Sequence, residues 1–374
     1  MMRAEFFRIL RSPALWLVLA VAVLGPFEMS SYYLHIATLA LIYVALCSAW
    51  NIVGGIGGQI SLGHSLFVGL GSLLASALLL KLGINLWLGM LIAAVLSGAA
   101  GAMIAWIDFR FRLGHLSFAL ITLAFAEMAE IVAIGWDFVG GASGLLLPHD
   151  MGNFLAFQFG GGKGSYWAAL TVAVVCVTAN LAILNAPLGY ALRCIRNNED
   201  AAQAIGVGLL RTKMLAMVIS AVLTSIVGTV YARYLAFVDP YQLASPLITV
   251  EIVLFATVGG LGSAFGPALG AIVLVPLGEI LRGKLGGVLP GLHAFIYGLI
   301  VIATIMLSPR GLLALFASRW TRKADSLIAN LAKLFSAATG PLLRSALPRS
   351  RPPCAAAASR TGARRPQNRR RSTT

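Results

Sequence analysis

The residues of this chain that could do chemistry are a few ionisable side chains inside long apolar stretches. Glu127 and Glu130 are three residues apart, which places them on one face of a helix. His64 and Glu251 each lie near the end of another apolar stretch. Ionisable groups in such surroundings mark ion or substrate pathways, or they pair with other charges. Glu127 and Glu130 therefore fit either proton or ion coupling or pairing with an arginine or a neighbouring subunit.

Other kinds of active chemistry lack their motifs. The cysteines show no C-x-x-C pairing and no histidine at metal-ligand spacing. The run GGGKGS at 160–165 imitates a phosphate-binding loop, but no Ser or Thr follows Lys163 directly. No motif of a hydrolase, a metalloprotease or a dinucleotide-binding fold occurs. We therefore expect no enzymatic activity, no metal, no cofactor and no ATP bound by this chain itself.

The elements that must position these residues are membrane spans. Residues of the set AVILMFWYC make up 59% of the chain, only 11% are charged, and the mean hydropathy is +0.88. Soluble domains carry about 25% charged residues, and a spanning helix needs about 20 mostly apolar residues. The apolar segments are 13–27, 31–53, 61–80, 86–107, 113–135, 166–185, 214–235, 249–260, 265–281 and 288–308. The sequence predicts an all-α, polytopic transmembrane bundle of about 8–10 spans.

The basic residues predict the orientation of this bundle. With ten crossings, or eight plus a re-entrant pair at 249–281, all four basic loops fall on one side, which the positive-inside rule makes cytoplasmic. These loops contain Arg3 to Arg11, Arg110 and Arg112, Arg193 to Lys213, and Arg310 to Lys323. Both termini are then cytoplasmic. Arg282 and Lys284 lie on the external side, against the rule.

The cytoplasmic loop 186–213 has features of a short displayed helix. Asn198 is a good N-cap, Glu199 and Asp200 lie in the first turn, where the helix dipole favours negative charge, and Gly206 ends the helix. Ala201 and Ala202 give it a slim surface. Such a helix fits a groove on another protein, or it is a surface connector.

The glycine-rich stretch 54–63 also has two readings. Gly54 and Gly58 have GxxxG spacing, as do Gly262, Gly266 and Gly270, which favours close helix packing. Alternatively, unwound backbone in this stretch lines a translocation path.

Several motifs follow one another in a fixed order over residues 32–316. In one-letter code they include N-x-x-x-G-x-x-G-Q-x-S-L-G-H at 51–64, ITLAF at 121–125, E-x-A-A-x-A-x-G at 199–206, GGLGS at 259–263 and PRGL at 309–312. The motif at 199–206 resembles the cytoplasmic coupling loop of ABC importer permeases. The whole set resembles the branched-chain amino acid permease family, in particular the second of its two paralogous membrane subunits. The sequence departs from the family's pattern at 55–56 and 112–115, and the residues after about 317 have no counterpart in the family.

This resemblance implies a membrane subunit, residues 1–317 with a coupling loop at 190–212, of an importer in a bacterial inner membrane. It implies a paralogous permease, two cytoplasmic ATPase subunits that bind the ATP, and a periplasmic or extracellular solute-binding protein. The substrate is leucine, isoleucine, valine or a related small solute; a urea or amide permease and an ion-coupled secondary amino acid transporter are alternatives. Expected coupling residues are Glu199, Ala201, Ala202 and Gly206, and expected path residues are Gln59, Ser61, His64, Glu127 and Glu251.

The net charge of +15 belongs mostly to the C-terminal end. Residues 1–309 hold 14 Lys and Arg against 12 Asp and Glu, whereas residues 310–374 hold 14 against one. Residues 318–374 form a basic tail that is too polar to bury a core, so we expect disorder. It fits binding to anionic lipid or an extension foreign to the permease. Without interleaved aromatic residues, its charge does not predict a nucleic-acid partner.

Overall fold

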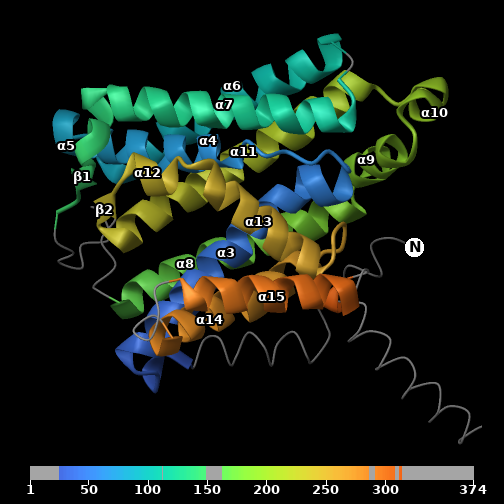
Figure 1. Cartoon of the computed structure of the whole chain (residues 1–374). Coiled ribbons are helices and arrows are strands. Elements are labelled where there is room, and N and C mark those ends of the chain that lie inside the picture. The colour runs from blue at the N-terminus through green and yellow to red at the C-terminus, as the bar shows by residue number, and fades with distance from the viewer. Residues whose placement is uncertain (1–24, 112, 149–161, 286–290, 308–310, 314–374) are drawn as a thin grey trace, which may run out of the picture. The chain divides into compact units, whose positions relative to one another are not determined.

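The computed structural model describes residues 25–111, 113–148, 162–285, 291–307 and 311–313 (Figure 1). The chain divides into two compact units, Met1–Ala317 and Ser318–Thr374. All described residues belong to the first unit. The predicted tail at 318–374 and most of the first predicted segment, 13–24, lie outside the described residues.

Helices make up nearly all of the described chain. They are α3 (Ser31–Asn51), the π-helix Ile52–Ile56, α4 (His64–Gly69), the π-helix Leu70–Leu74, α5 (Ala75–Leu82), α6 (Leu86–Phe111), α7 (His115–Gly135), α8 (Gly162–Asn185), α9 (Pro187–Asn197), α10 (Glu199–Ala204), α11 (Leu209–Leu235), α12 (Pro240–Leu243), α13 (Pro246–Gly259), α14 (Gly266–Leu285) and α15 (Leu292–Leu307). Three short 3₁₀ helices are Gly25–Phe27, Asp137–Val139 and Gly141–Ser143. One short antiparallel pair, β1 (Leu145–Leu146) and β2 (Phe237–Val238), ties the loop after α7 to the end of α11.

The predicted all-α membrane fold is confirmed. Seven helical stretches of the described residues are long and apolar enough to span a membrane: Ser31–Ile56, His64–Leu82, Leu86–Phe111, Leu116–Gly135, Gly162–Asn185, Leu209–Leu235 and Pro240–Gly259. A shorter apolar helix follows at Leu292–Met306. The segment predicted at 249–260 begins earlier, because Pro240 and Pro246 occupy first turns of helices, where a missing N–H is tolerated. The next predicted segment is the separate helix α14.

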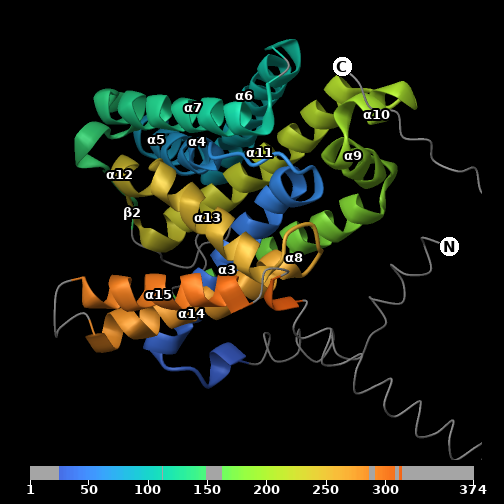
Figure 2. The same cartoon turned by 45° about the vertical axis from the view of Figure 1, so that its right-hand side comes forward.

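Helix α3 is the centre of the bundle. It packs against α8, α11, α13 and α14, and its large side chains Ile42, Leu46 and Trp50 are buried. Figures 1 and 2 show α6 and α7 along one side of this unit and α14 and α15 along the opposite side, with α3, α11 and α13 between them. Helices α6 and α7 leave apolar side chains exposed, among them Leu91, Val95, Leu120 and Ile131. Exposed apolar side chains of this kind suit contact with lipid or with another membrane subunit.

Close contact between α13 and α14 depends on glycine. A Cβ atom added at Gly270 would lie 1.9 Å from the carbonyl oxygen of Phe255, and one at Gly259 would lie 1.9 Å from that of Gly266. Any side chain would therefore push the two backbones apart. At this helix pair the small residues serve packing, as in other membrane helix pairs.

Candidate functional site

The predicted short helix of the loop 186–213 is present as α10, and it follows the amphipathic helix α9. The Asn198 side-chain oxygen accepts a hydrogen bond of 2.9 Å from the backbone N–H of Ala201, which confirms the predicted N-cap. Glu199 and Asp200 lie in the first turn, and the chain leaves the helix through Gly206 at φ +89°. Figures 1 and 2 show α9 and α10 at one end of the bundle.

Glu199 anchors α10 to the bundle through a row of charged and polar side chains. Its carboxylate lies 2.8 Å from the Lys213 ammonium at the start of α11. The same ammonium lies 3.0 Å from the Asp108 carboxylate near the end of α6. Oδ2 of Asp108 also accepts a hydrogen bond of 2.9 Å from the Gln59 amide. A residue of the displayed helix is thus linked to the glycine-rich stretch by three successive contacts.

The inner part of this row is sealed from solvent. The side chains of Lys213 and Asp108 are 4% and 1% exposed, whereas that of Glu199 is 34% exposed. Opposite charges in such a site stabilise each other strongly, but each was stripped of water during folding. The pair therefore holds its geometry firmly: without Lys213 the buried Asp108 has no counter-charge, and without Asp108 the buried Lys213 keeps only the partly exposed Glu199. A cavity of about 300 Å³ between α6 and α10 adjoins the row.

Arg196 makes a second link between the displayed loop and the glycine-rich stretch. Its guanidinium donates a hydrogen bond of 2.7 Å to the carbonyl oxygen of Gly55 in the π-helix Ile52–Ile56. Gly58 has φ +72°, and a Cβ atom there would lie 2.5 Å from Cγ of Arg196. Glycine at this position therefore meets both a backbone and a packing requirement.

Asn51 connects the end of α3 with two other parts of the bundle. Its amide nitrogen donates to Asn180 Oδ1 of α8 at 3.2 Å and to the carbonyl oxygen of Ser263 at 3.1 Å. Its oxygen accepts a hydrogen bond of 3.0 Å from the backbone N–H of Gly262. The first residue of the motif at 51–64 is thus fully engaged in holding the fold.

Two expected path residues, Ser61 and His64, lie together in the interior. His64 Nε2 lies 2.8 Å from Ser220 Oγ, and Ser220 donates to the carbonyl oxygen of Ala49. Because the Ser220 hydroxyl donates its proton to Ala49, it must accept a hydrogen bond from Nε2–H of His64. The other ring nitrogen, Nδ1, lies 3.2 Å from Ser61 Oγ. Both Ser61 and His64 are buried. The backbone carbonyl of Ser61 accepts a hydrogen bond from the indole N–H of Trp50. In this conformation Ser61 and His64 connect α3, α4 and α11, and their role in a translocation path stays a prediction.

The carboxylates that the sequence singled out, Glu127, Glu130 and Glu251, lie in different surroundings. Glu127 is exposed and Glu130 is half-buried on α7, and among the residues that the structure describes neither forms an ion pair. Glu251, in α13, accepts a hydrogen bond from the Tyr43 hydroxyl of α3 and faces a cavity. Glu199 and Gln59 are therefore joined through Lys213 and Asp108. Ser61 and His64 form a separate cluster, and Glu127 and Glu251 belong to neither group.

The small residues of α10 divide into two kinds. Ala202 is 2% exposed and packs inward, so in this chain it does not present the surface that we expected from it. Ala201 is exposed, as are Gly206 and the large apolar side chain of Ile205. The surface that α10 offers is therefore Ala201 and its exposed neighbours, and Ile205 is a residue that the sequence did not single out.

Sequence reasoning also missed Asp108, Lys213 and Arg196 as members of this site. Arg196 and Lys213 served there only as indicators of the cytoplasmic side. The available signal was Asp108 itself, a carboxylate next to an apolar segment that needs an opposite charge. The sequence could not name its partner, which lies 105 residues further along the chain.

Comparison with known proteins gives a consistent result. Residues 32–305 match the family model described as "Branched-chain amino acid transport system / permease component". The high-affinity branched-chain amino acid transport system permease protein LivM of Escherichia coli (strain K12) is 29% identical over 290 residues, which cover 71% of this chain and 67% of that protein. The probable branched-chain amino acid transport permease protein LivM of Methanocaldococcus jannaschii is 26% identical over 224 residues, covering 59% of this chain and 63% of that protein. No solved structure matches.

Proposed function

Because the chain belongs to the branched-chain amino acid transport permease family, we propose that it is a membrane-spanning subunit of an ATP-driven importer. Its cargo is leucine, isoleucine or valine. The transport role and the membrane location follow from the family and from the seven apolar spans. The direction of transport, its energy source and its substrates are the proposed part.

The row Glu199–Lys213–Asp108–Gln59 is the observation that carries this proposal. It joins a short helix at one end of the bundle to the buried stretch between α3 and α4, over contacts of 2.8 to 3.0 Å. A partner that moves α10 therefore pulls on a rigid internal connection. Coupling of this kind needs two arrangements of a packed element that the partner biases. Helix α10 is the proposed contact with a cytoplasmic ATPase.

The other proposed partners complete the transporter. A paralogous permease covers part of the exposed apolar surface of the spans, two ATPase subunits supply the energy, and a solute-binding protein delivers the amino acid. The location is a bacterial inner membrane with the α9–α10 end in the cytoplasm. The basic residues Arg193, Arg196 and Lys213 at that end support this orientation.

The experiment is leucine uptake into proteoliposomes that hold the full complex, with ATP inside and the binding protein outside. We expect uptake that requires ATP and the ATPase subunits and that persists when a protonophore is present. Valine and isoleucine should compete, and urea and acetamide should not.

The alternatives predict other outcomes. Uptake that collapses with the protonophore at constant ATP, and that needs no ATPase, would replace the proposal by an ion-coupled transporter that uses Glu127 and Glu130. Uptake of urea or acetamide in place of leucine would keep the ATP-driven mechanism and change the substrate.

A further inference from the structure

A second polar cluster lies at the end of the bundle opposite Glu199 and Lys213. Tyr231, which lines it, is 18 residues after Lys213 on the same helix α11, a separation of about 27 Å along the helix axis. That distance is close to the thickness of a bilayer core. The cluster surrounds a cavity of about 520 Å³ formed by α3, α11, α12, α13, α14 and α15, a volume in the range of small-molecule sites.

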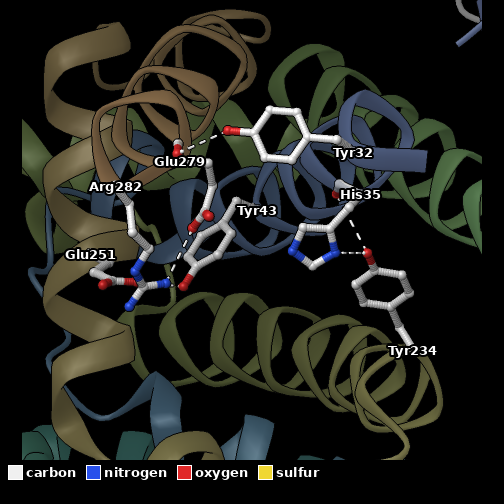
Figure 3. A network of polar contacts seen from close by, with 7 residues as sticks. All are labelled: Tyr32, His35, Tyr43, Tyr234, Glu251, Glu279 and Arg282. Carbon is white, nitrogen blue, oxygen red and sulfur yellow. Dashed lines mark hydrogen bonds and ion pairs between the residues drawn. The ribbon is translucent and has the colours of Figure 1, made fainter. Parts of the chain in front are cut away.

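Charges of both signs face this cavity. Glu251 accepts from Tyr43, and the Arg282 guanidinium lies 3.5 Å from the Glu279 carboxylate, the side chain of Arg282 being 69% exposed. Figure 3 shows Tyr43, Glu251, Glu279 and Arg282 gathered in one group beside the His35–Tyr234 pair. Only one of the five N–H donors of the guanidinium is used by Glu279 in this arrangement.

Part of the remaining wall of the cavity is aliphatic, beside tyrosine rings and the polar side chains of Gln242, Ser245 and His293. Leu39 of α3, Leu254 of α13 and Leu274 of α14 line it together with Val275. The cavity therefore presents two carboxylates, one guanidinium and an apolar surface within one space. An aliphatic α-amino acid carries the complementary groups: an ammonium for a carboxylate, a carboxylate for the guanidinium, and an apolar side chain for the aliphatic surface.

The charged side chains Glu251, Glu279 and Arg282 would be unfavourable in contact with lipid. Ionisable side chains of membrane helices are expensive there and are retained where they face water or protein. Arg282 is also unexpected by the positive-inside rule, since the predicted topology puts it on the external side. Binding of an anionic group in the cavity would explain the position of Arg282. The same topology places the cavity at the external end, where solute enters an importer.

We infer that this cavity binds an aliphatic α-amino acid in its zwitterionic form, with Glu251 on the ammonium group and Arg282 on the carboxylate. The side chain lies against Leu254 and Leu274. Arginine suits this role because its fork of donors matches a carboxylate. This inference rests on the proposed function and adds the site at which the membrane subunit receives its cargo.

Photo-leucine, a diazirine analogue of leucine, tests the site directly. The full complex in lipid nanodiscs is irradiated with photo-leucine without ATP, and the labelled peptides are identified by mass spectrometry. We expect labels within 246–259 and 266–285. L-leucine should chase them, whereas isoamylamine, which lacks the carboxylate, and 4-methylpentanoate, which lacks the ammonium, should not chase them at equal concentration.

Matched variants test the two charges. Arg282→Gln and Glu251→Gln should each reduce labelling about tenfold or more, because each removes a charge-assisted contact. Lys284→Gln is the control, because it removes the same charge two residues further along α14 without lining the cavity. Arg282→Lys keeps the charge and should retain part of the labelling.

Two results would overturn the site. One is equal labelling of Arg282→Gln, Glu251→Gln and Lys284→Gln; the other is equal chase by leucine, isoamylamine and 4-methylpentanoate. The second result needs only the unaltered complex, so it decides even where a variant fails to assemble. Because labelling uses no ATP, a failure of ATP-driven uptake counts against the proposed function and leaves this test intact.

Discussion

The ammonium of Lys213 lies 3.0 Å from the carboxylate of Asp108, and both side chains are shielded from solvent. Lys213 lies near the beginning of α11 and Asp108 near the end of α6, so this ion pair fixes two spans against each other close to α10. Its position makes it both a structural contact and the middle of the connection from Glu199 to Gln59.

Removing one charge of this pair should destabilise the protein strongly. We expect Asp108→Asn to lower the free energy of unfolding by up to about 3–5 kcal/mol, because the buried Lys213 then keeps only the partly exposed Glu199 as a counter-charge. Thermal unfolding of the detergent-solubilised chain measures this. The double variant Asp108→Asn with Lys213→Met should recover much of the loss, since no unpaired buried charge remains and Glu199 is partly exposed. Equal stability of the single variant and the unaltered protein would show that the pair is not closed in solution.

The outer contact of the row should contribute the same modest energy to transport as to stability. Glu199→Gln breaks an ion pair that is partly exposed, so stability should change by less than about 1 kcal/mol. We expect ATP-driven uptake to fall roughly two- to fivefold, which is the same energy expressed as a ratio. Asp200→Asn, in the same turn, forms no described ion pair and is the control. A loss of uptake that is the same in both variants would contradict a specific role for Glu199.

The two adjacent alanines of α10 should respond differently to a large side chain. Ala201→Trp places the indole on an exposed position, so we expect normal folding and a drop in uptake of about tenfold or more from a blocked partner surface. Ala202→Trp overfills a buried position and should instead destabilise by about 1–3 kcal/mol or more. Uptake and thermal unfolding are measured for both. Full uptake by Ala201→Trp would remove α10 as the site of ATPase contact.

The contact of α13 with α14 should not tolerate even one methyl group. Gly270→Ala brings Cβ within 1.9 Å of the Phe255 carbonyl oxygen, and we expect a loss of about 1–3 kcal/mol in stability. Gly298→Ala in α15 meets nothing within 4 Å and should be neutral or stabilising by about 0.5–1 kcal/mol. Thermal unfolding of the two variants compares them. Equal effects would show that the helix pair separates easily.

The sequence predicted the elements of this protein better than their contacts. Asn198 and Gly206 marked the ends of α10 correctly, because capping depends on residues next to each other in the chain. The beginning of the span Pro240–Gly259 was missed, because proline suits a loop as well as a first helical turn. The pairing of Lys213 with Asp108 could not be predicted, since many folds bring distant charges together. His64 shows the same limit, because an ionisable residue in an apolar segment can serve packing as well as transport.

The central position of α3 has a consequence for the synthesis of the protein. Asn51 is bonded to Asn180 and to the Ser263 carbonyl, which follow it by 129 and 212 residues. At a synthesis rate of about 5–20 residues per second, the second partner emerges roughly 10–40 seconds after Asn51. During that interval the most enclosed of the apolar spans stands in the membrane with its Asn51 amide lacking at least the Ser263 partner. The bundle therefore closes around a helix made early only when its last third has been inserted, and chains interrupted before α14 should be substrates for membrane proteolysis.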